Sequence, residues 1–357
     1  MKERILQLQP YKPGKSPEQI KREYNVDNVI KLASNENAFG CSPTIAQAVN
    51  KALKEVSTYP DGHAELLRKK VAEHVNVKET ELLFGAGLDE VIQILSRVLL
   101  CEGSNIVTAD QTFVQYKHHA VIEGAEIREV PLINGHFNLD EMASTIDNET
   151  KIVWICNPNN PTGTYVSEKE LMNFLQKIPR HVTVVLDEAY YEYVMAEDYP
   201  QTIPFIKDYK NLIVLRTFSK AYGLASLRIG YAVGNENLIE KLNIGRLPFN
   251  TSTLAQVAAA AALEDQDFIK YTVEETRKGI LFFEQELNTL GISYYPSQTN
   301  FIFIHAKNPE AVFTKFIEKG YIVRPMANGI RISIGTMEQN QGVINILKDN
   351  IDKSLLL

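Results

Sequence analysis

The chain contains few cysteines, no excess of positive charge and no long hydrophobic segment. Its three cysteines, Cys41, Cys101 and Cys156, show no paired spacing within 357 residues. Such usage is typical of a reduced, cytoplasmic protein rather than a disulfide-stapled one. The 37 Lys and Arg residues are outnumbered by 44 Asp and Glu residues, for a net charge of −7. We therefore expect neither nucleic acid nor an anionic membrane surface as a partner.

The apolar residues are spread over short segments. The longest apolar run, residues 257–263, is too short to span a bilayer. The basic residues near the first methionine are not followed by the apolar stretch of a signal peptide. The adjacent His118 and His119 would point apart on a helix, and no third ligand is spaced to join them. We therefore expect no membrane span and no metal site.

Short β-branched runs alternate with amphipathic segments between about residues 80 and 235. Ser167 and Glu170 form a capping-box signature at the start of one of the amphipathic segments. The alternation predicts an α/β fold with a large, mostly parallel sheet that carries helices on both faces. Its predicted buried parallel strands are residues 105–109, 151–156, 182–186 and 212–216.

The pattern changes after residue 265. A long amphipathic segment over residues 266–290 is followed by strand-like runs at 300–305 and 329–335, with a helix-like segment between them. We expect a smaller α+β domain that packs with the amino-terminal arm. The predicted division is residues 1–40 as the N-terminal arm and part of the small domain, 41–265 as the large domain, and 266–357 as the small C-terminal domain.

Polar motifs follow three of the predicted strands. They are Asn157 to Gly163, Asp187 to Tyr190 and Thr217 to Lys220. Ligands of open parallel sheets bind beyond the carboxyl ends of the strands, so the three motifs are expected to share one site. A lysine amine, a carboxylate and hydrogen-bond donors are the groups that pyridoxal 5'-phosphate (PLP) chemistry needs. The three motifs together offer each of these groups.

These motifs resemble those of the fold-type I PLP-dependent aminotransferases, and the resemblance extends over nearly the whole chain. Among these enzymes it is nearest to the histidinol-phosphate aminotransferases. The segments that carry it are residues 10–14, 32–37, 59–62, 157–163, 187–190, 219–228, 248–250 and 331–336.

The resemblance implies roles for the residues around the cofactor ring. Lys220 holds PLP covalently and then moves protons, and Asp187 keeps the pyridine nitrogen protonated. Asn160 and Tyr190 donate hydrogen bonds to the phenolic oxygen of the ring. Phe113 stacks on the ring, although an aromatic residue at this position also suits core packing. The implied catalytic residues are Lys220, Asp187 and Tyr190.

The phosphate of PLP needs fixed donors and positive charge. The resemblance implies the Ser219 hydroxyl, the Arg228 guanidinium and the backbone amides of Leu88 and Asp89 at the start of a helix. It also implies that Tyr59 reaches the phosphate of a neighbouring subunit, which predicts a homodimer with shared sites. A turn aromatic is the other interpretation of Tyr59.

The resemblance also implies substrate contacts in the small domain. Arg331 binds the substrate α-carboxylate, and Arg324 meets the phosphate of histidinol phosphate, with Tyr11 beside it. Asn35, in the Leu32–Asn37 segment, is implied as a further substrate contact. Either arginine also suits a solvated strand position. The expected partners are an amino donor and a 2-oxo acid.

The reaction admits alternatives. The favoured one is transamination between L-histidinol phosphate and 2-oxoglutarate in histidine biosynthesis. An aromatic (phenylalanine or tyrosine) aminotransferase and a PLP decarboxylase of a phosphorylated amino acid are the competitors. The segment between Arg324 and Arg331 is shorter than the family pattern, which bears on substrate choice. A non-enzymatic PLP-binding regulator is disfavoured because only about thirty residues, and not basic ones, precede the 32–37 segment.

Overall fold

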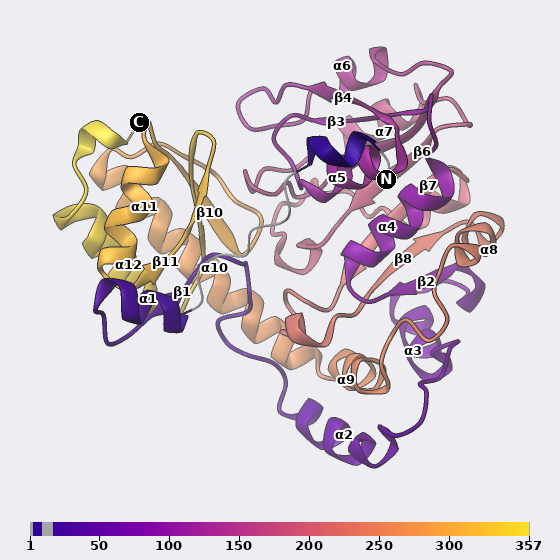
Figure 1. Cartoon of the computed structure of the whole chain (residues 1–357), viewed down its shortest axis with the longest axis horizontal. Helices are drawn as coiled ribbons and strands as arrows, with labels where there is room; N and C mark the ends of the chain where they lie inside the picture. Colours follow the sequence, from indigo (N-terminus) through magenta and orange to yellow (C-terminus); the bar gives the residue numbers. More distant parts are fainter. Residues whose placement is uncertain (1–2, 9–16, 357) are drawn as a thin grey trace.

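The computed structural model describes residues 3–8 and 17–356. Its larger part is built on a seven-stranded sheet of order β2-β8-β7-β6-β5-β3-β4 (Figure 1). Only β8 runs in the direction opposite to the other strands, so the predicted mostly parallel sheet is confirmed. The four predicted strands correspond to β3, β5, β6 and β7. The strands are β2 (Leu82–Gly85), β3 (Asn105–Ala109), β4 (Glu126–Val130), β5 (Thr150–Cys156), β6 (Thr183–Asp187), β7 (Leu212–Thr217) and β8 (Gly230–Gly234).

Helices cover both faces of this sheet because its strands are apolar on both sides. In β6, Val184 and Leu186 belong to the core shared with α3, α7 and α9. Val185 points the other way, into the core shared with α4, α5 and α8. The predicted capping box of Ser167 and Glu170 starts α7. The helices are α2 (Thr44–Ala52), α3 (Glu65–Val75), α4 (Leu88–Leu99), α5 (Gln115–Glu123), α6 (Leu139–Ser144), α7 (Glu168–Leu175), α8 (Glu236–Ile244) and α9 (Thr253–Glu264).

The C-terminal part begins with the long helix α10 and is built on an antiparallel sheet of order β12-β13-β10-β9. Two segments from near the amino terminus join it: β1 pairs in parallel with β11, and Ile20 of α1 is buried against Ile317 and Ile322. The domain boundaries at residues 40 and 265 stay predictions. The elements are α1 (Pro17–Tyr24), β1 (Ile30–Lys31), α10 (Gln266–Leu290), β9 (Tyr294–Tyr295), β10 (Phe301–His305), α11 (Pro309–Glu318), β11 (Tyr321–Ile322), β12 (Arg324–Met326), β13 (Gly329–Ser333) and α12 (Met337–Asp349).

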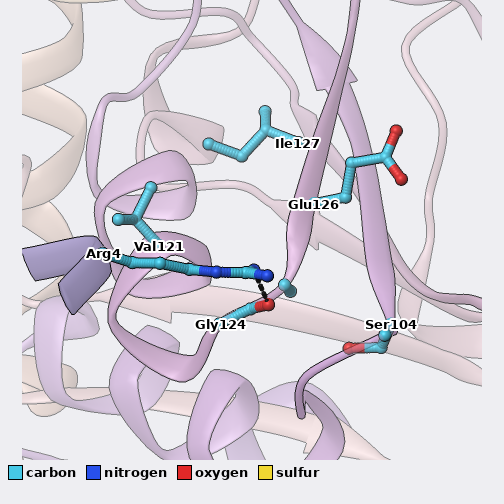
Figure 2. Close-up of a pocket in the computed structure, with 8 residues that line it drawn as sticks. Arg4, Ser104, Val121, Gly124, Glu126 and Ile127 are labelled. Atoms are coloured by element: carbon cyan, nitrogen blue, oxygen red, sulfur yellow. Dashed lines mark hydrogen bonds between the residues drawn. The ribbon is translucent and has the colours of Figure 1, made fainter. Parts of the chain in front are cut away.

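A short 3-10 helix, η1 (Glu3–Gln7), lies apart from α1 and contacts α5 of the larger part (Figure 1). Figure 2 shows Arg4 reaching from η1 to the carbonyl oxygen of Gly124, beside a hollow of about 530 Å³. A second contact joins Arg4 to Glu102, with 3.6 Å between Nη2 and Oε1. Throughout the described residues, every helix is too short or too polar to cross a bilayer.

Candidate active site

The predicted site residues meet in a cavity of about 820 Å³ at the carboxyl edge of the large sheet. Strand direction explains the meeting, because β3, β5, β6 and β7 are parallel and their following loops emerge at one edge. β2 ends at the same edge, since Gly85 and Thr217 both pair with Gly230. The predicted residues that line the cavity are Asn35, Leu88, Asp89, Phe113, Asn160, Asp187, Tyr190, Ser219, Lys220, Arg228, Arg324 and Arg331.

Lys220 lies in the loop after β7, with its amine inside the cavity. Its Nζ is 3.3 Å from the carbonyl oxygen of Ser34 and 5.7 Å from the ring centre of Tyr190. Burial, followed by the positive charge of Arg331, lowers the pKa of Lys220 to about 8. Roughly a tenth of the amine is therefore neutral and nucleophilic at pH 7, far more than for an ordinary lysine.

Asp187 is the last residue of β6, and the residue is only 3% exposed. Oδ1 accepts the Ala189 amide at 3.1 Å, and Oδ2 accepts the Tyr116 hydroxyl at 2.6 Å. Burial raises the pKa of Asp187 to about 6, while these two donors oppose the rise. The carboxylate is thus held in one orientation and is ionised above about pH 6.

Tyr190 is held by residues from both ends of the chain. Asn35, which is 1% exposed, donates its Nδ2 to the Tyr190 hydroxyl at 2.9 Å. The backbone amide of Asn35 donates to Ser333 Oγ at 2.8 Å, and Asn300 donates to the Asn35 carbonyl at 3.0 Å. Because the Tyr190 oxygen accepts from Asn35, its own proton is directed toward another acceptor.

Two arginines on neighbouring strands face the cavity. Arg331 of β13 donates Nη1 to Asn160 Oδ1 at 2.5 Å and Nη2 to the Ala33 carbonyl at 2.7 Å. Its contact with the carbonyl oxygen of Asn160 turns the amide nitrogen of Asn160 to the other side. Arg324 of β12 lies directly opposite Arg331 in the antiparallel register, so both side chains project from the same sheet face.

The start of α4 lies beside Arg228, and Ser219 lines the same cavity. Gly87 caps α4 with a φ of +80°, and a Cβ there would lie 2.3 Å from Nη2 of Arg228. Glycine therefore makes room for the guanidinium beside the helix amino terminus, where backbone N–H groups favour negative charge. Arg228 also contacts Asp89, with 3.3 Å between Nη2 and Oδ2.

Among the described residues, Tyr59 is the predicted one that the structure does not bring into the cavity. Tyr59 lies on the surface, where 83% of its area is exposed and its ring stacks on Phe249 at 4.9 Å. Tyr11 lies outside the described residues.

Sequence reasoning missed three residues that support the site from behind. Tyr116 follows Phe113 by three positions, a helical spacing that indicates a shared face. Glu188 and Arg216 form a buried ion pair with 2.6 Å between Oε2 and Nη2. The sequence does hold a signal for this ion pair, because a charged residue stands at the end of an apolar strand and a buried charge needs a partner.

The fold and these side chains are those of a PLP-dependent enzyme of fold type I. The family model for aminotransferase class I and II matches residues 27–347, and the chain belongs to this family. It is 53% identical to histidinol-phosphate aminotransferase 2 of Bacillus cereus ATCC 14579 over 352 residues, covering 99% of this chain and 96% of that one. It is 54% identical to histidinol-phosphate aminotransferase 1 of Bacillus cereus ATCC 10987 over 361 residues, covering 99% and 98%.

The chain is also similar to a solved structure that contains the cofactor. Histidinol-phosphate aminotransferase from Sinorhizobium meliloti, in complex with pyridoxal-5'-phosphate, superposes with a TM-score of 0.89. It is 25% identical, and the match covers 98% of both chains. The predicted fold type and the prediction of PLP as cofactor are confirmed.

Proposed function

We propose that the enzyme transfers the amino group of L-histidinol phosphate to 2-oxoglutarate, forming imidazole acetol phosphate and glutamate in histidine biosynthesis. Relatives 53% and 54% identical over 99% of the chain carry the name of this activity. The observation that carries the proposal is the pair of opposed arginines, Arg324 and Arg331, beside Lys220 in one cavity.

Like charges directly opposite each other destabilise a sheet, so a pair of arginines there needs a compensating role. Anionic groups of the substrates would compensate the two positive charges. 2-Oxoglutarate carries two carboxylates, and histidinol phosphate carries a single phosphate. In our proposal Arg331 binds the α-carboxylate, and Arg324 binds the phosphate or the second carboxylate. Asn35, which lines the cavity, is a further substrate contact in this proposal.

The residues of the cavity fit PLP. Lys220 would hold it covalently, with Phe113 on the side of the ring and Asp187 on the side of the pyridine nitrogen. The amides of Leu88 and Asp89 at the start of α4, together with Ser219 and Arg228, would hold its phosphate. When bound, PLP supplies an electron sink for the carbanion formed at the substrate carbon.

The remaining chemistry belongs to the side chains. Asp187 stays ionised and keeps a proton on the pyridine nitrogen. Asn160 and Tyr190 donate to the phenolic oxygen, the former oriented by Arg331 and the latter by Asn35. The neutral amine of Lys220 would take up the proton from the substrate carbon and return it. The pKa of about 8 for its amine suits both directions of this transfer near neutral pH.

We also propose a homodimer in which Tyr59 reaches the phosphate group of its partner. Support comes from the exposed ring of Tyr59 and its stacking partner Phe249, which are 83% and 46% exposed. Val56, Ile244 and Leu247, which lie near these two residues in the sequence, are also exposed, by 60%, 84% and 59%. Burial of such apolar side chains against a second copy is favourable. A cytoplasmic location stays a prediction.

Mixed dimers test this arrangement. Chains with Lys220→Ala and chains with Tyr59→Ala are each expected to be impaired. When co-expressed, they form dimers in which one site has both residues intact. Activity above that of either parent supports a shared site. A mixture no better than its parents, or a monomer by sedimentation, contradicts it.

The central experiment is a half-reaction on PLP-loaded enzyme. The absorption band of the lysine-bound cofactor is followed after L-histidinol phosphate or L-phenylalanine is added without an oxo acid. Fast bleaching by histidinol phosphate alone supports the proposal. Equal bleaching by both indicates an aromatic or dual aminotransferase, and no bleaching by either favours a decarboxylase.

A further inference from the structure

Tyr116 of α5 packs between aromatic side chains and donates a hydrogen bond to the carboxylate of Asp187. It is fully buried, and its hydroxyl lies 2.6 Å from Asp187 Oδ2. Since an ionised carboxylate only accepts hydrogen bonds, the phenol is the donor. Ala189 donates its amide to the other oxygen at 3.1 Å. Each oxygen of Asp187 thus has its own fixed donor.

The ring of Tyr116 is clamped by its neighbours. It stacks on Trp154, with ring centroids 4.5 Å apart and an interplanar angle of 7°. Phe113 meets it edge-on, with centroids 5.6 Å apart and an angle of 79°. These contacts fix the orientation of the Tyr116 ring, with its hydroxyl toward Asp187. The side chain therefore needs no further ordering when the cofactor binds.

The surroundings of Asp187 disfavour its charge. Burial raises the pKa of Asp187, the negative charges of Asp89 and Glu188 act in the same direction, and the Tyr116 hydroxyl opposes them. Burial and the nearby charge of Asp187 raise the pKa of Tyr116 well above its ordinary value, so the phenol keeps the proton that it donates. The titratable groups around Asp187 are Asp89, Tyr116, Cys156, Glu188 and Tyr190.

We propose that Tyr116 is a positioning residue for the cofactor: its hydroxyl keeps the Asp187 carboxylate ionised and aimed into the cavity. The inference rests on the proposed role of Asp187 toward the pyridine nitrogen, and it adds a residue to which the sequence motifs give no role. It concerns cofactor binding, so its test does not depend on the substrate.

The test is the pH dependence of PLP binding to the apoenzyme. Trp154 is the single tryptophan of the chain and stacks on Tyr116 beside the cavity, so its fluorescence reports cofactor binding. In the unmodified enzyme, affinity is expected to fall as pH drops through about 6, because Asp187 becomes protonated. Removing a hydrogen bond to a charged group moves a pKa by roughly one to two units. Tyr116→Phe should therefore raise the midpoint by that amount and weaken binding at pH 6.5 by about 3- to 25-fold.

A matched control uses Tyr165, whose hydroxyl also donates to a carboxylate at 2.6 Å, that of Asp198 on the surface. Tyr165→Phe should leave the midpoint unchanged. In Asp187→Asn the group that titrates near pH 6 is gone, so the step near pH 6 should be lost, while the dependence around pH 8 that Lys220 causes remains. An unshifted midpoint in Tyr116→Phe, together with loss of the step near pH 6 in Asp187→Asn, overturns the role of Tyr116 and leaves that of Asp187 standing. A retained midpoint in Asp187→Asn overturns the proposed role of Asp187 itself.

A second variant keeps the inference testable if Tyr116→Phe does not fold. Replacement of Tyr116 by 3-fluorotyrosine retains the ring and its O–H donor, so the midpoint should not rise above that of the unmodified enzyme, because the donor is what matters. A rise of a full unit or more despite that donor would contradict the proposal.

Discussion

The buried ion pair behind the site allows a stability prediction. Glu188 Oε2 lies 2.6 Å from Nη2 and 2.7 Å from Nε of Arg216, and the two side chains are 0% and 7% exposed. Thr202 donates to the other carboxylate oxygen at 2.6 Å, and the guanidinium carbon lies 3.2 Å from the ring centre of Tyr191. The perturbation is Arg216→Met, which fills similar space without the charge.

Removing one partner of a buried pair costs about 3–5 kcal/mol, because the other charge is left buried without compensation. With a slope of about 3 kcal/mol/M in urea, the unfolding midpoint should fall by roughly 1–2 M. Arg128→Met is the matched control, since that arginine pairs with Asp147 at 2.7 Å but is 25% exposed. Its cost should stay below about 1 kcal/mol.

The pH dependence supplies a second test of the same pair. Burial raises the pKa of Glu188, and Arg216 opposes the rise, so Arg216→Met should raise that pKa further. A carboxyl whose pKa is higher in the folded than in the unfolded protein loses stability as pH rises above the unfolded value. The deficit should therefore be larger at pH 8 than at pH 5, and Glu188→Gln in the same chain should recover part of it. A deficit as small as that of Arg128→Met would refute the reasoning.

Four further outcomes are expected. Lys220→Ala should abolish turnover and leave PLP removable by dialysis. In the unmodified apoenzyme, covalent capture of PLP should rise with pH around 8, because only the neutral amine attacks. A midpoint of capture near pH 10.5 would contradict the lowered pKa of Lys220. Asp187→Ala should lower the rate by several orders of magnitude, since the pyridine nitrogen loses its anionic partner. Arg324→Ala should weaken histidinol phosphate more than phenylalanine in steady-state kinetics, whereas equal losses would place the phosphate elsewhere. Gly223→Ala should cost at least about 1–3 kcal/mol in urea unfolding, because φ is +72° and the new Cβ would lie 1.9 Å from the Gly40 carbonyl oxygen.

The strand ends of the site were predictable because parallel strands present their following loops at one edge. Residues in such loops, such as Asp187 and Lys220, could be brought together from sequence alone. The contact of Tyr116 with Asp187 could not, because it depends on how α5 is rotated against the sheet. The hydrogen bond from Asn35 to Tyr190 joins positions 155 residues apart, and no local sequence pattern predicts such a contact.

The junction of both chain ends at Tyr190 and Asn160 has a consequence for biosynthesis. Asn35 meets Ser333 across 298 residues of sequence, and Arg331 reaches back over the same span to the carbonyl of Ala33. A chain emerging from the ribosome can fold the large sheet before its last strands exist, since folding proceeds from the amino terminus. The hydrogen bond between Asn35 and Ser333 can therefore form only after β13 has been synthesised. The same holds for the opposed arginines, Arg324 and Arg331, and for the orientation that Arg331 gives to Asn160. A nascent or truncated chain therefore carries the lysine but not the means to hold a substrate beside it.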